Sequence, residues 1–509
     1  MKTEVLRAYR FTLAPSPAQE QKLLRWCGNA RLAFNYALAA KKTAHEQWRA
    51  QVDTLVAGGI PEAQARKQTK VPIPSKPTVQ KAFNAERGDT RAEVEGVCPW
   101  WHEVNTYVFQ SAFIDADRAW KNWLESFAGK RAGRRVGYPR FKKRGRARDS
   151  FRLHHDVKKP GIRLATHRRL RIGSFGEVRL HDSGKRLFRQ VARGEAVVQS
   201  VTVSRGGHRW YASVLCKVTM DIPDRPTRRQ TERGKVGVDL GVKVLAALSK
   251  PLPTDGPVKV SGGGLLVDNP RPLRAAMQGL AKAQRVLSRK QKGSKAREKA
   301  WQRVGQLHHQ VAVRRNAVLH QVTKTLATRF SIVAVENLHV AGMTRSARGT
   351  AEAPGRRVRQ KAGLNRAILD SAPGELRRQL AYKTSWYGSQ LAVLDRWWPS
   401  SKTCSDCGWQ DTSQTLADRT FHCTNCGLTM DRDLNAALNI ERHTETPNVA
   451  SDRGETQNAC RASVRLPGPR AGEQGAAKRE DAGLSGPAPP RRSNPPTLPP
   501  QGHKQVKLF

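Results

Sequence analysis

The sequence contains no apolar run long enough to cross a membrane. A membrane-spanning helix needs about 18 or more consecutive apolar residues, and no stretch of the 509-residue chain provides them. The opening residues, MKTEVLRAYRF, also lack the apolar centre of a secretory signal peptide. We therefore expect a cytoplasmic protein with no membrane partner.

Cysteine is also scarce, with eight residues in 509. Four of them form two Cys-x-x-Cys pairs, and the other four, Cys27, Cys98, Cys216 and Cys460, are scattered along the chain. A disulfide-stapled scaffold carries a higher density of cysteine in a much shorter chain. The scattered cysteines are therefore expected to be reduced thiols.

Acidic residues are also scarce: the chain has 42 Asp and Glu but 91 Lys and Arg, which gives a formal net charge of +49. A folded chain with this excess repels itself unless polyanions neutralise it. Nucleic acid is the natural partner, since phosphate contacts would dominate its affinity. Residues 443–509 contain ten Lys and Arg and six Asp and Glu, a net charge of +4. The remaining +45 of the formal charge lies on residues 1–442. A ribosomal or general RNA-binding protein is the plain alternative.

The amino-terminal half contains both strand and helix signals. Residues 3–13 alternate apolar and polar side chains as a strand does, whereas residues 18–52 and 102–128 have apolar residues at helical spacing. Residues 160–219 contain short apolar runs separated by turn residues, which predicts a small β-barrel or sandwich.

Residues 129–152 form a dense basic stretch with aromatic side chains between the charges. A charge run alone is usually a solvated face, but interleaved aromatic rings also allow bases to stack. The candidate nucleic-acid contacts in this stretch are Arg134, Arg135, Tyr138, Arg140, Phe141, Lys142 and Lys143. Two further candidates, Arg289 and Lys290, lie in a basic helical region, residues 271–328.

A second pattern begins near Gly234. GKVGVDLGVKVLAALS predicts two strands that meet at Gly241, and FSIVAVENL and LAVLDRWW predict two more strands. Helical spacing runs through residues 271–328, with a break at Gly293-Ser294, and from Leu364 to about Tyr387. After residue 443 the chain holds 10 of its 29 prolines and little apolar periodicity, which predicts a disordered tail.

The two cysteine pairs predict a zinc site. Cys404, Cys407, Cys423 and Cys426 are spaced as Cys-x2-Cys-x15-Cys-x2-Cys, and a glycine follows each pair. Four thiolates complete a tetrahedron around Zn²⁺ and leave no position for water, so the site is expected to be structural. His422 adjoins the third cysteine as an alternative ligand.

Three acidic residues lie where catalytic carboxylates gather. Asp239 interrupts the apolar strand VGVDLGV, Glu336 ends the strand IVAVEN, and Asp433 begins the amphipathic segment DLNAALNIER. A carboxylate in an apolar strand must be paired, protonated or metal-bound, and converging carboxylates hold the divalent ions that cleave phosphodiesters. Singly, each has a plainer interpretation: an ion pair, a strand end, or a helix cap for Asp433 and Asp431 alike.

These motifs together resemble a known family. GVDLGV, AVENL, PSSKTCSDCG, CTNCG and DRDLNAALNI are similar to the split RuvC motifs and zinc module of TnpB proteins, which transposons encode, and of the related compact type V CRISPR effectors. YRFTLAPSPAQEQKLLRWCGNARLAFNYAL and YPRFKKRG resemble their amino-terminal half, so the resemblance covers residues 1–442. It implies an α+β multidomain chain: an amino-terminal helical recognition lobe with a small β-barrel, and an RNase H-like (RuvC) α/β nuclease domain carrying an inserted zinc module.

The resemblance also implies domain limits. They are a β-barrel domain at 1–17 and 130–233, a helical recognition domain at 18–129, nuclease segments at 234–402 and 428–442, a zinc module at 403–427, and the tail at 443–509.

The activity that the resemblance implies is RNA-guided hydrolysis of DNA beside a short transposon-associated motif. Catalysis and Mg²⁺, which Mn²⁺ can replace, map onto Asp239, Glu336 and Asp433, the last being chosen over Asp431 because it directly precedes LNAA. Structural Zn²⁺ and a structured guide RNA complete the implied cofactors, and double-stranded DNA is the implied target.

Lys76 and Gln80, in SKPTVQK at a predicted helix start, are candidates to read the motif beside the target, with ordinary exposed residues as the plain alternative. Other functions stay open at this point: a CRISPR-associated type V effector, a non-cutting RNA-guided DNA-binding protein, or a transposase. The sequence leaves the oligomeric state open. A nucleic-acid enzyme of this kind would associate with a prokaryotic nucleoid.

Overall fold

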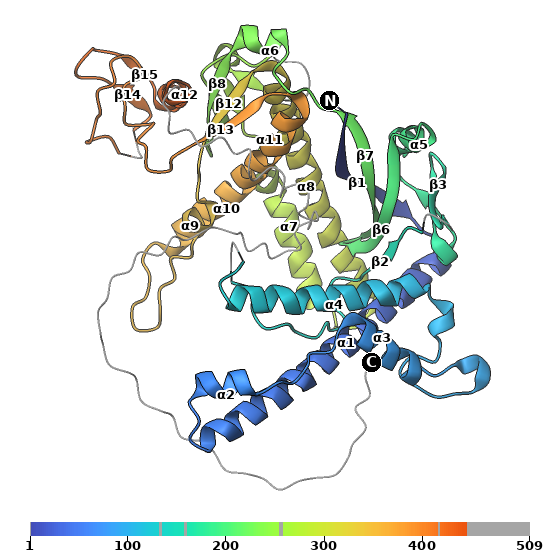
Figure 1. Ribbon diagram of the computed structural model, residues 1–509. Coiled ribbons are helices and arrows are strands. Elements are labelled where there is room, and N and C mark those ends of the chain that lie inside the picture. The colour runs from blue at the N-terminus through green and yellow to red at the C-terminus, as the bar shows by residue number, and fades with distance from the viewer. Residues whose placement is uncertain (1, 132–134, 157–159, 254–257, 416–417, 445–509) are drawn as a thin grey trace. The chain divides into compact units, whose positions relative to one another are not determined.

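The computed structural model describes residues 2–131, 135–156, 160–253, 258–415 and 418–444 (Figure 1). Within these ranges the chain forms a seven-stranded sheet, a six-stranded sheet and a two-stranded ribbon. None of the helices in these ranges is long and apolar enough to span a bilayer. Arg134 and the predicted disordered segment beyond residue 444 lie outside the described residues.

The amino-terminal half surrounds the seven-stranded sheet. Its strands are β1 (Lys2–Ala14), β2 (Ser150–His154), β3 (Ile162–Thr166), β4 (Arg169–Ile172), β5 (Glu177–Leu180), β6 (Ala196–Gly206) and β7 (Arg209–Asp221). Its helices are α1 (Pro17–Ala57), α2 (Glu62–Gln68), α3 (Lys76–Glu86), α4 (Thr106–Phe127), α5 (Lys185–Ala192) and α6 (Arg228–Arg233). Every ladder in this sheet is antiparallel, in the order β2-β6-β7-β1-β5-β4-β3.

This sheet curls around an aromatic core. Strand β3, at one end of the order, also contacts β6 near the other end, which a flat sheet would not allow. The Trp26 ring of α1 meets Phe151 and Phe175 edge-on, each at 5.3 Å between centroids. The predicted barrel is thus a curled sheet whose outer strands β2 and β3 form no ladder with each other in the described residues.

Capping explains where the long helices begin. In α1, Ser16 and Gln19 form a reciprocal capping box and Pro17 occupies the first turn. In α4, the Asn105 side chain accepts a hydrogen bond from the Tyr107 amide. The sequence prediction of one helix at 18–52 is confirmed, although the helix continues to Ala57.

The carboxyl-terminal half is built on the six-stranded sheet, in the order β10-β11-β9-β8-β12-β13. Its strands are β8 (Lys235–Asp239), β9 (Val244–Leu248), β10 (Val260–Ser261), β11 (Leu266–Asp268), β12 (Ile332–Glu336) and β13 (Gln390–Leu394). Its helices are α7 (Pro272–Arg289), α8 (Lys295–Arg329), α9 (Val340–Met343), α10 (Val358–Ser371), α11 (Pro373–Tyr387) and α12 (Arg432–His443). The ribbon consists of β14 (Thr420–His422) and β15 (Thr429–Asp431).

Alternation along β8 gives its two faces different partners. Val236 and Val238 join a core with side chains of α8 and α11. Gly237, between them, points to the other face, where α12 lies so close that a Cβ would be 2.0 Å from the Ala437 carbonyl oxygen. A glycine at this position therefore lets α12 rest directly on the sheet.

The helix boundaries test the sequence predictions. The break at Gly293 is confirmed, because α7 and α8 flank it. The single helix predicted from Leu364 to Tyr387 is wrong: α10 ends at Ser371, Ala372 adopts a left-handed conformation (φ 52°), and Pro373 starts α11. Proline restricts its preceding residue against helical geometry, which explains the break.

Candidate functional site

Two carboxylates lie side by side at the ends of parallel strands. Val335 of β12 pairs with Val238 of β8 in parallel register, so Glu336 and Asp239 are the next positions of neighbouring strands. Adjacent strands are about 4.8 Å apart. Because side chains alternate, Asp239 shares the face of Gly237, the face that α12 covers.

The first turn of α12 brings the third acid to this edge. Asp431 is the N-cap, and its carboxylate accepts hydrogen bonds from the amides of Asp433 (2.9 Å) and Leu434 (3.2 Å). The Asp433 carboxylate is not used as a cap, and it approaches the Arg432 guanidinium at 3.8 Å. The two aspartates therefore have different positions and different partners, although they are two residues apart.

The electrostatics of the three acids are coupled. Burial raises the pKa of Asp239 to about 8, and the negative charges of Glu336 and Asp433 add to the effect, against a smaller opposing effect of Arg432. Burial also raises the pKa of Glu336, while a hydrogen bond from the Ser400 hydroxyl opposes the rise. Carboxylates that destabilise one another's charge in this way favour a cation among them.

The four cysteines of the two pairs converge. Their Sγ atoms all lie within 4.8 Å of one another, with Cys404 to Cys426 at 3.6 Å and Cys407 to Cys423 at 3.5 Å. A tetrahedral Zn²⁺ with Zn–S bonds of about 2.3 Å requires sulfur separations of about 3.8 Å. The cluster therefore has the dimensions of a four-thiolate metal site.

Helix α12 is fixed to the first cysteine loop. Buried Asn435 accepts from the Ser405 amide (2.9 Å) and donates to the Thr403 carbonyl (2.7 Å). Asn439, one turn later, donates to the carbonyls of Ser400 (2.9 Å) and Thr403 (2.5 Å). The position of the loop is thus transmitted to the helix that carries the third acid.

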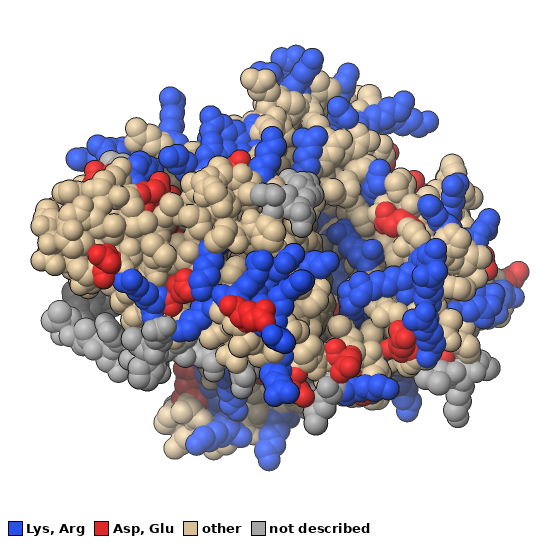
Figure 2. All heavy atoms as spheres, turned by 90° about the horizontal axis from the view of Figure 1, so that it is seen from above, with Lys and Arg blue, Asp and Glu red and all other residues tan. Residues whose placement is uncertain are grey.

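The predicted nucleic-acid contacts differ in exposure. Those that are exposed are Arg135, Arg140, Phe141, Lys143, Arg289 and Lys290. Lys76 and Gln80 are half-buried at the start of α3. Figure 2 shows Lys and Arg in several groups across one face of the molecule, outnumbering the Asp and Glu side chains that lie between them.

Two of these candidates are already engaged by the protein. The Tyr138 ring packs against Trp120 and Trp123, at 5.7 and 4.8 Å between centroids. Lys142 lies over the Phe34 ring at 3.7 Å, and its backbone is hydrogen-bonded to the Asn35 side chain. These contacts position the basic stretch along α1 and α4.

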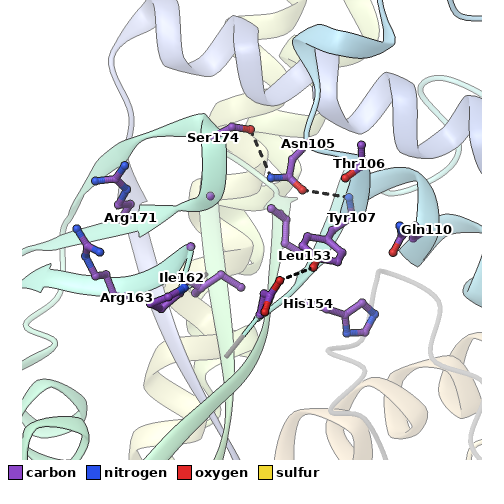
Figure 3. Close-up of a pocket in the computed structure, with 14 residues that line it drawn as sticks. Asn105, Thr106, Tyr107, Gln110, Leu153, His154, Ile162, Arg163, Arg171 and Ser174 are labelled. Carbon is purple, nitrogen blue, oxygen red and sulfur yellow. Dashed lines mark hydrogen bonds between the residues drawn. The ribbon is translucent and has the colours of Figure 1, made fainter. Parts of the chain in front are cut away.

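The structure also contains a polar pocket that sequence reasoning missed. It has a volume of about 650 Å³ and lies between the start of α4 and strands β2 to β4 (Figure 3). Asn105 donates to the Ser174 hydroxyl (3.4 Å), and the Tyr107 hydroxyl donates to Asp156 (3.1 Å). Arg163 and Arg171 line the same pocket.

Ser400 was also missed as a member of the acidic site. It lies in the PSSKTC motif, which sequence reasoning assigned to the zinc module. Its hydroxyl contacts Glu336 across 64 residues of sequence, and nothing local predicts such a contact.

Family models match three parts of the chain. Residues 1–50 match a model described as "Helix-turn-helix domain", residues 213–347 one described as "Probable transposase", and residues 374–440 one described as "Cas12f1-like, TNB domain". In this structure the first segment contains strand β1 and most of the single helix α1.

Named relatives match nearly the whole chain. A Mycobacterium tuberculosis protein named "Putative RNA-guided DNA endonuclease" is 35% identical over 478 residues, which cover 92% of this chain and 93% of that protein. The Escherichia coli protein "Putative RNA-guided DNA endonuclease InsQ" is 31% identical over 435 residues, covering 86% and 91%. The cryo-EM structure of a Cas12f1–sgRNA–target DNA complex aligns with a TM-score of 0.41 at 12% identity, over 88% of this chain and 99% of that one.

Proposed function

The chain belongs to the TnpB family of RNA-guided DNA endonucleases, and we propose that it cuts DNA at the site formed by Asp239, Glu336 and Asp433. The observation that supports this proposal is that the three acids act on one another at one edge of the six-stranded sheet. Burial raises the pKa of both Asp239 and Glu336, and the charges of Glu336 and Asp433 raise that of Asp239 further. A protein that only binds nucleic acid has no need of such a cluster.

The strand topology supports an RNase H-like (RuvC) nuclease domain. The first four strands, β8 to β11, form antiparallel ladders, and β12 and β13 then run parallel to β8. Ligands and catalytic groups gather at the carboxyl ends of such parallel strands. Asp239 and Glu336 occupy those ends in β8 and β12.

We propose that the three carboxylates hold Mg²⁺, which Mn²⁺ can replace. The fit rests on the donor set: hard oxygen ligands, crowded and partly buried, whose mutual repulsion a divalent cation relieves. When bound, such ions activate water and stabilise the oxygens of the phosphodiester being cut. Ser400 orients Glu336, and the Asp431 cap holds the first turn of α12, so that Asp433 faces the other two.

The cysteine cluster is proposed to hold a structural Zn²⁺. All four ligands are thiols, so no coordination position remains for water or substrate. Its function follows from the hydrogen bonds of Asn435 and Asn439 to Thr403, which make the metal loop a support for α12.

The proposed domains follow the sheets. Residues 1–17 and 130–233 contribute β1 to β7, and residues 18–129 contribute the recognition helices α1 to α4. Residues 234–402 and 428–442 form the nuclease domain around the zinc module at 403–427. The two-stranded ribbon crosses the boundary at residue 427: β14 lies inside the zinc module, and its partner β15 lies in the nuclease segment that follows.

The proposed guide is a structured RNA, and its presence is testable. The purified chain is expected to retain one abundant structured RNA with a variable 3′ end, because the body carries +45 and exposes a basic stretch at 135–143. Binding should weaken steeply with salt as phosphate contacts release counterions. Sequencing of the co-purified RNA checks this, and RNA-free protein that cuts a chosen DNA sequence unaided would contradict it.

Lys76 and Gln80 are proposed to read the motif beside the target. They lie one turn apart on one side of α3. Burial is the largest cause that lowers the pKa of the pocket residue His154; Arg152 lowers it and Asp115 raises it by smaller amounts, and the charge of Lys76 adds a still smaller lowering. The start of α3 therefore lies near the pocket.

Replacing both residues with Ala is expected to relax or abolish the motif requirement while guide RNA stays bound. The reason is that base-edge contacts carry discrimination, about 1–3 kcal/mol for each good pair, whereas RNA affinity is spread over many cations. A cleavage library with randomised flanking sequence measures the preference. Lys81→Ala, an exposed lysine on another side of the same helix, is the matched control. An unchanged preference in the double variant removes both residues from the site.

A further inference from the structure

Trp397 is the most exposed large apolar side chain in the described residues, at 82%, and the next is Phe127 at 62%. It lies three positions after the end of β13, in the segment that leads from the six-stranded sheet to the cysteine cluster. A single exposed apolar side chain is common on protein surfaces, so the position of this ring near the proposed cutting site, rather than its exposure alone, points to a ligand.

The backbone around Trp397 is held at both ends of the turn. Its amide donates to the Asp395 carboxylate (2.8 Å), and the adjacent Arg396 donates from Nε to the Asn337 carbonyl (3.2 Å). The next residue, Trp398, stacks on His443 of α12 with centroids 4.1 Å apart and planes at 7°. Trp398 thus fixes the turn, and the indole of Trp397 is left in solvent.

The same turn contacts the acidic site. Asn337, which Arg396 contacts, follows Glu336 in sequence, and Ser400 donates its hydroxyl to Glu336 itself. Ser400 is three positions after Trp397, so their Cα atoms are at most about 11 Å apart. Trp397 therefore lies in the same short turn as the residue that contacts Glu336, and the exposed side chain of Arg396 adjoins it in sequence.

We propose that Trp397 is a stacking platform for an unpaired base of the DNA strand that enters the carboxylate site. This inference rests on the proposed nuclease function and identifies a residue that would hold the DNA substrate at the site. A flat aromatic face accepts any base, and a neighbouring cation neutralises the backbone, which is the combination that single-stranded nucleic acid requires. The stacked base positions the adjacent phosphate at the carboxylates.

Trp397→Ala should lower the single-turnover cleavage rate about 5- to 160-fold, the value of one base–aromatic stack. Trp397→Phe should restore most of the rate, because it keeps an aromatic face. Guide RNA retention and affinity for the target duplex should not change. Phe188→Ala, an exposed ring located on α5, is the control and should cut at the parent rate.

A contact readout independent of cutting uses the Asp239→Ala chain loaded with guide and target. 5-Iododeoxyuridine is placed at successive positions of each DNA strand, and irradiation should crosslink Trp397 to one or two positions beside the cut. Absence of that crosslink at every position, or parent-rate cleavage by Trp397→Ala, overturns the assignment of Trp397. Failure of the parent chain to cut guided DNA would overturn the proposed function instead, and the crosslink would still report on Trp397.

Discussion

Changing Asp239, Glu336 or Asp433 singly to Ala is expected to abolish DNA cleavage while guided DNA binding stays nearly at the parent level. The loss should be on the order of 10³-fold or more, because charge that develops on the attacking and leaving oxygens is stabilised only by correctly placed cations. Affinity is supplied by many Lys and Arg and by base pairing, so one carboxylate contributes little to it. Cleavage rate and DNA affinity are measured with one guide.

Asp431 provides a matched control for Asp433. Asp431→Asn keeps a side-chain oxygen that can accept the amides of Asp433 and Leu434, and Asn is as good an N-cap as Asp. Asp433→Asn has the same size change and removes the charge that the cluster requires. We therefore expect nearly full cutting by Asp431→Asn and none by Asp433→Asn. The reverse outcome would show that the wrong aspartate has been assigned, and full cutting by Asp239→Ala would exclude this nuclease site.

Loss of the cysteine cluster should have the second largest effect. Cys404→Ser or Cys426→Ser is expected to release the metal, disorder the 403–431 segment and stop cleavage, since structural zinc contributes about 10–16 kcal/mol to the folding of small zinc modules. The loss should also displace Asp433, because Asn435 and Asn439 of the same helix donate hydrogen bonds to the Thr403 carbonyl in the first cysteine loop.

Metal content by elemental analysis and cleavage rate together check this expectation. His422→Ala is the control: His422 adjoins the ligand Cys423, yet its Nδ1 is 2.8 Å from the Thr429 hydroxyl within the β14-β15 ribbon. It should keep its zinc and its activity. A zinc-free parent chain, or a Cys404→Ser variant that cuts normally, would contradict the structural role.

Local pattern predicted those elements whose side chains repeat with a regular period. VGVD and IVAVE became β8 and β12, and Gly293 separated two helices, because apolar periodicity and glycine act within a few residues. The same periodicity places Asp239 and Glu336 at strand ends, so candidate acids could be chosen without coordinates.

Contacts distant in sequence could not be predicted in this way. The need for glycine at position 237 depends on the approach of Ala437, two hundred residues later. Asp431 and Asp433 are equivalent as sequence signals, and only the geometry of α12 distinguishes cap from candidate ligand. Tyr138 belonged to a stretch that resembled a stacking surface, but its ring packs against Trp120 and Trp123, because aromatic residues serve cores as readily as bases.

The placement of Asp433 on α12 has a consequence during protein synthesis. Its codon is read long after that of Asp239, since 433 − 239 = 194 residues separate them. At about 5–20 residues per second, the ribosome needs about 10–40 s to cover that interval. Throughout it the nascent chain already contains the amino-terminal sheet and the first carboxylate, but no third acid and no cysteine cluster until the end. The proposed cutting centre is therefore completed only after the elements proposed to bind RNA have been synthesised.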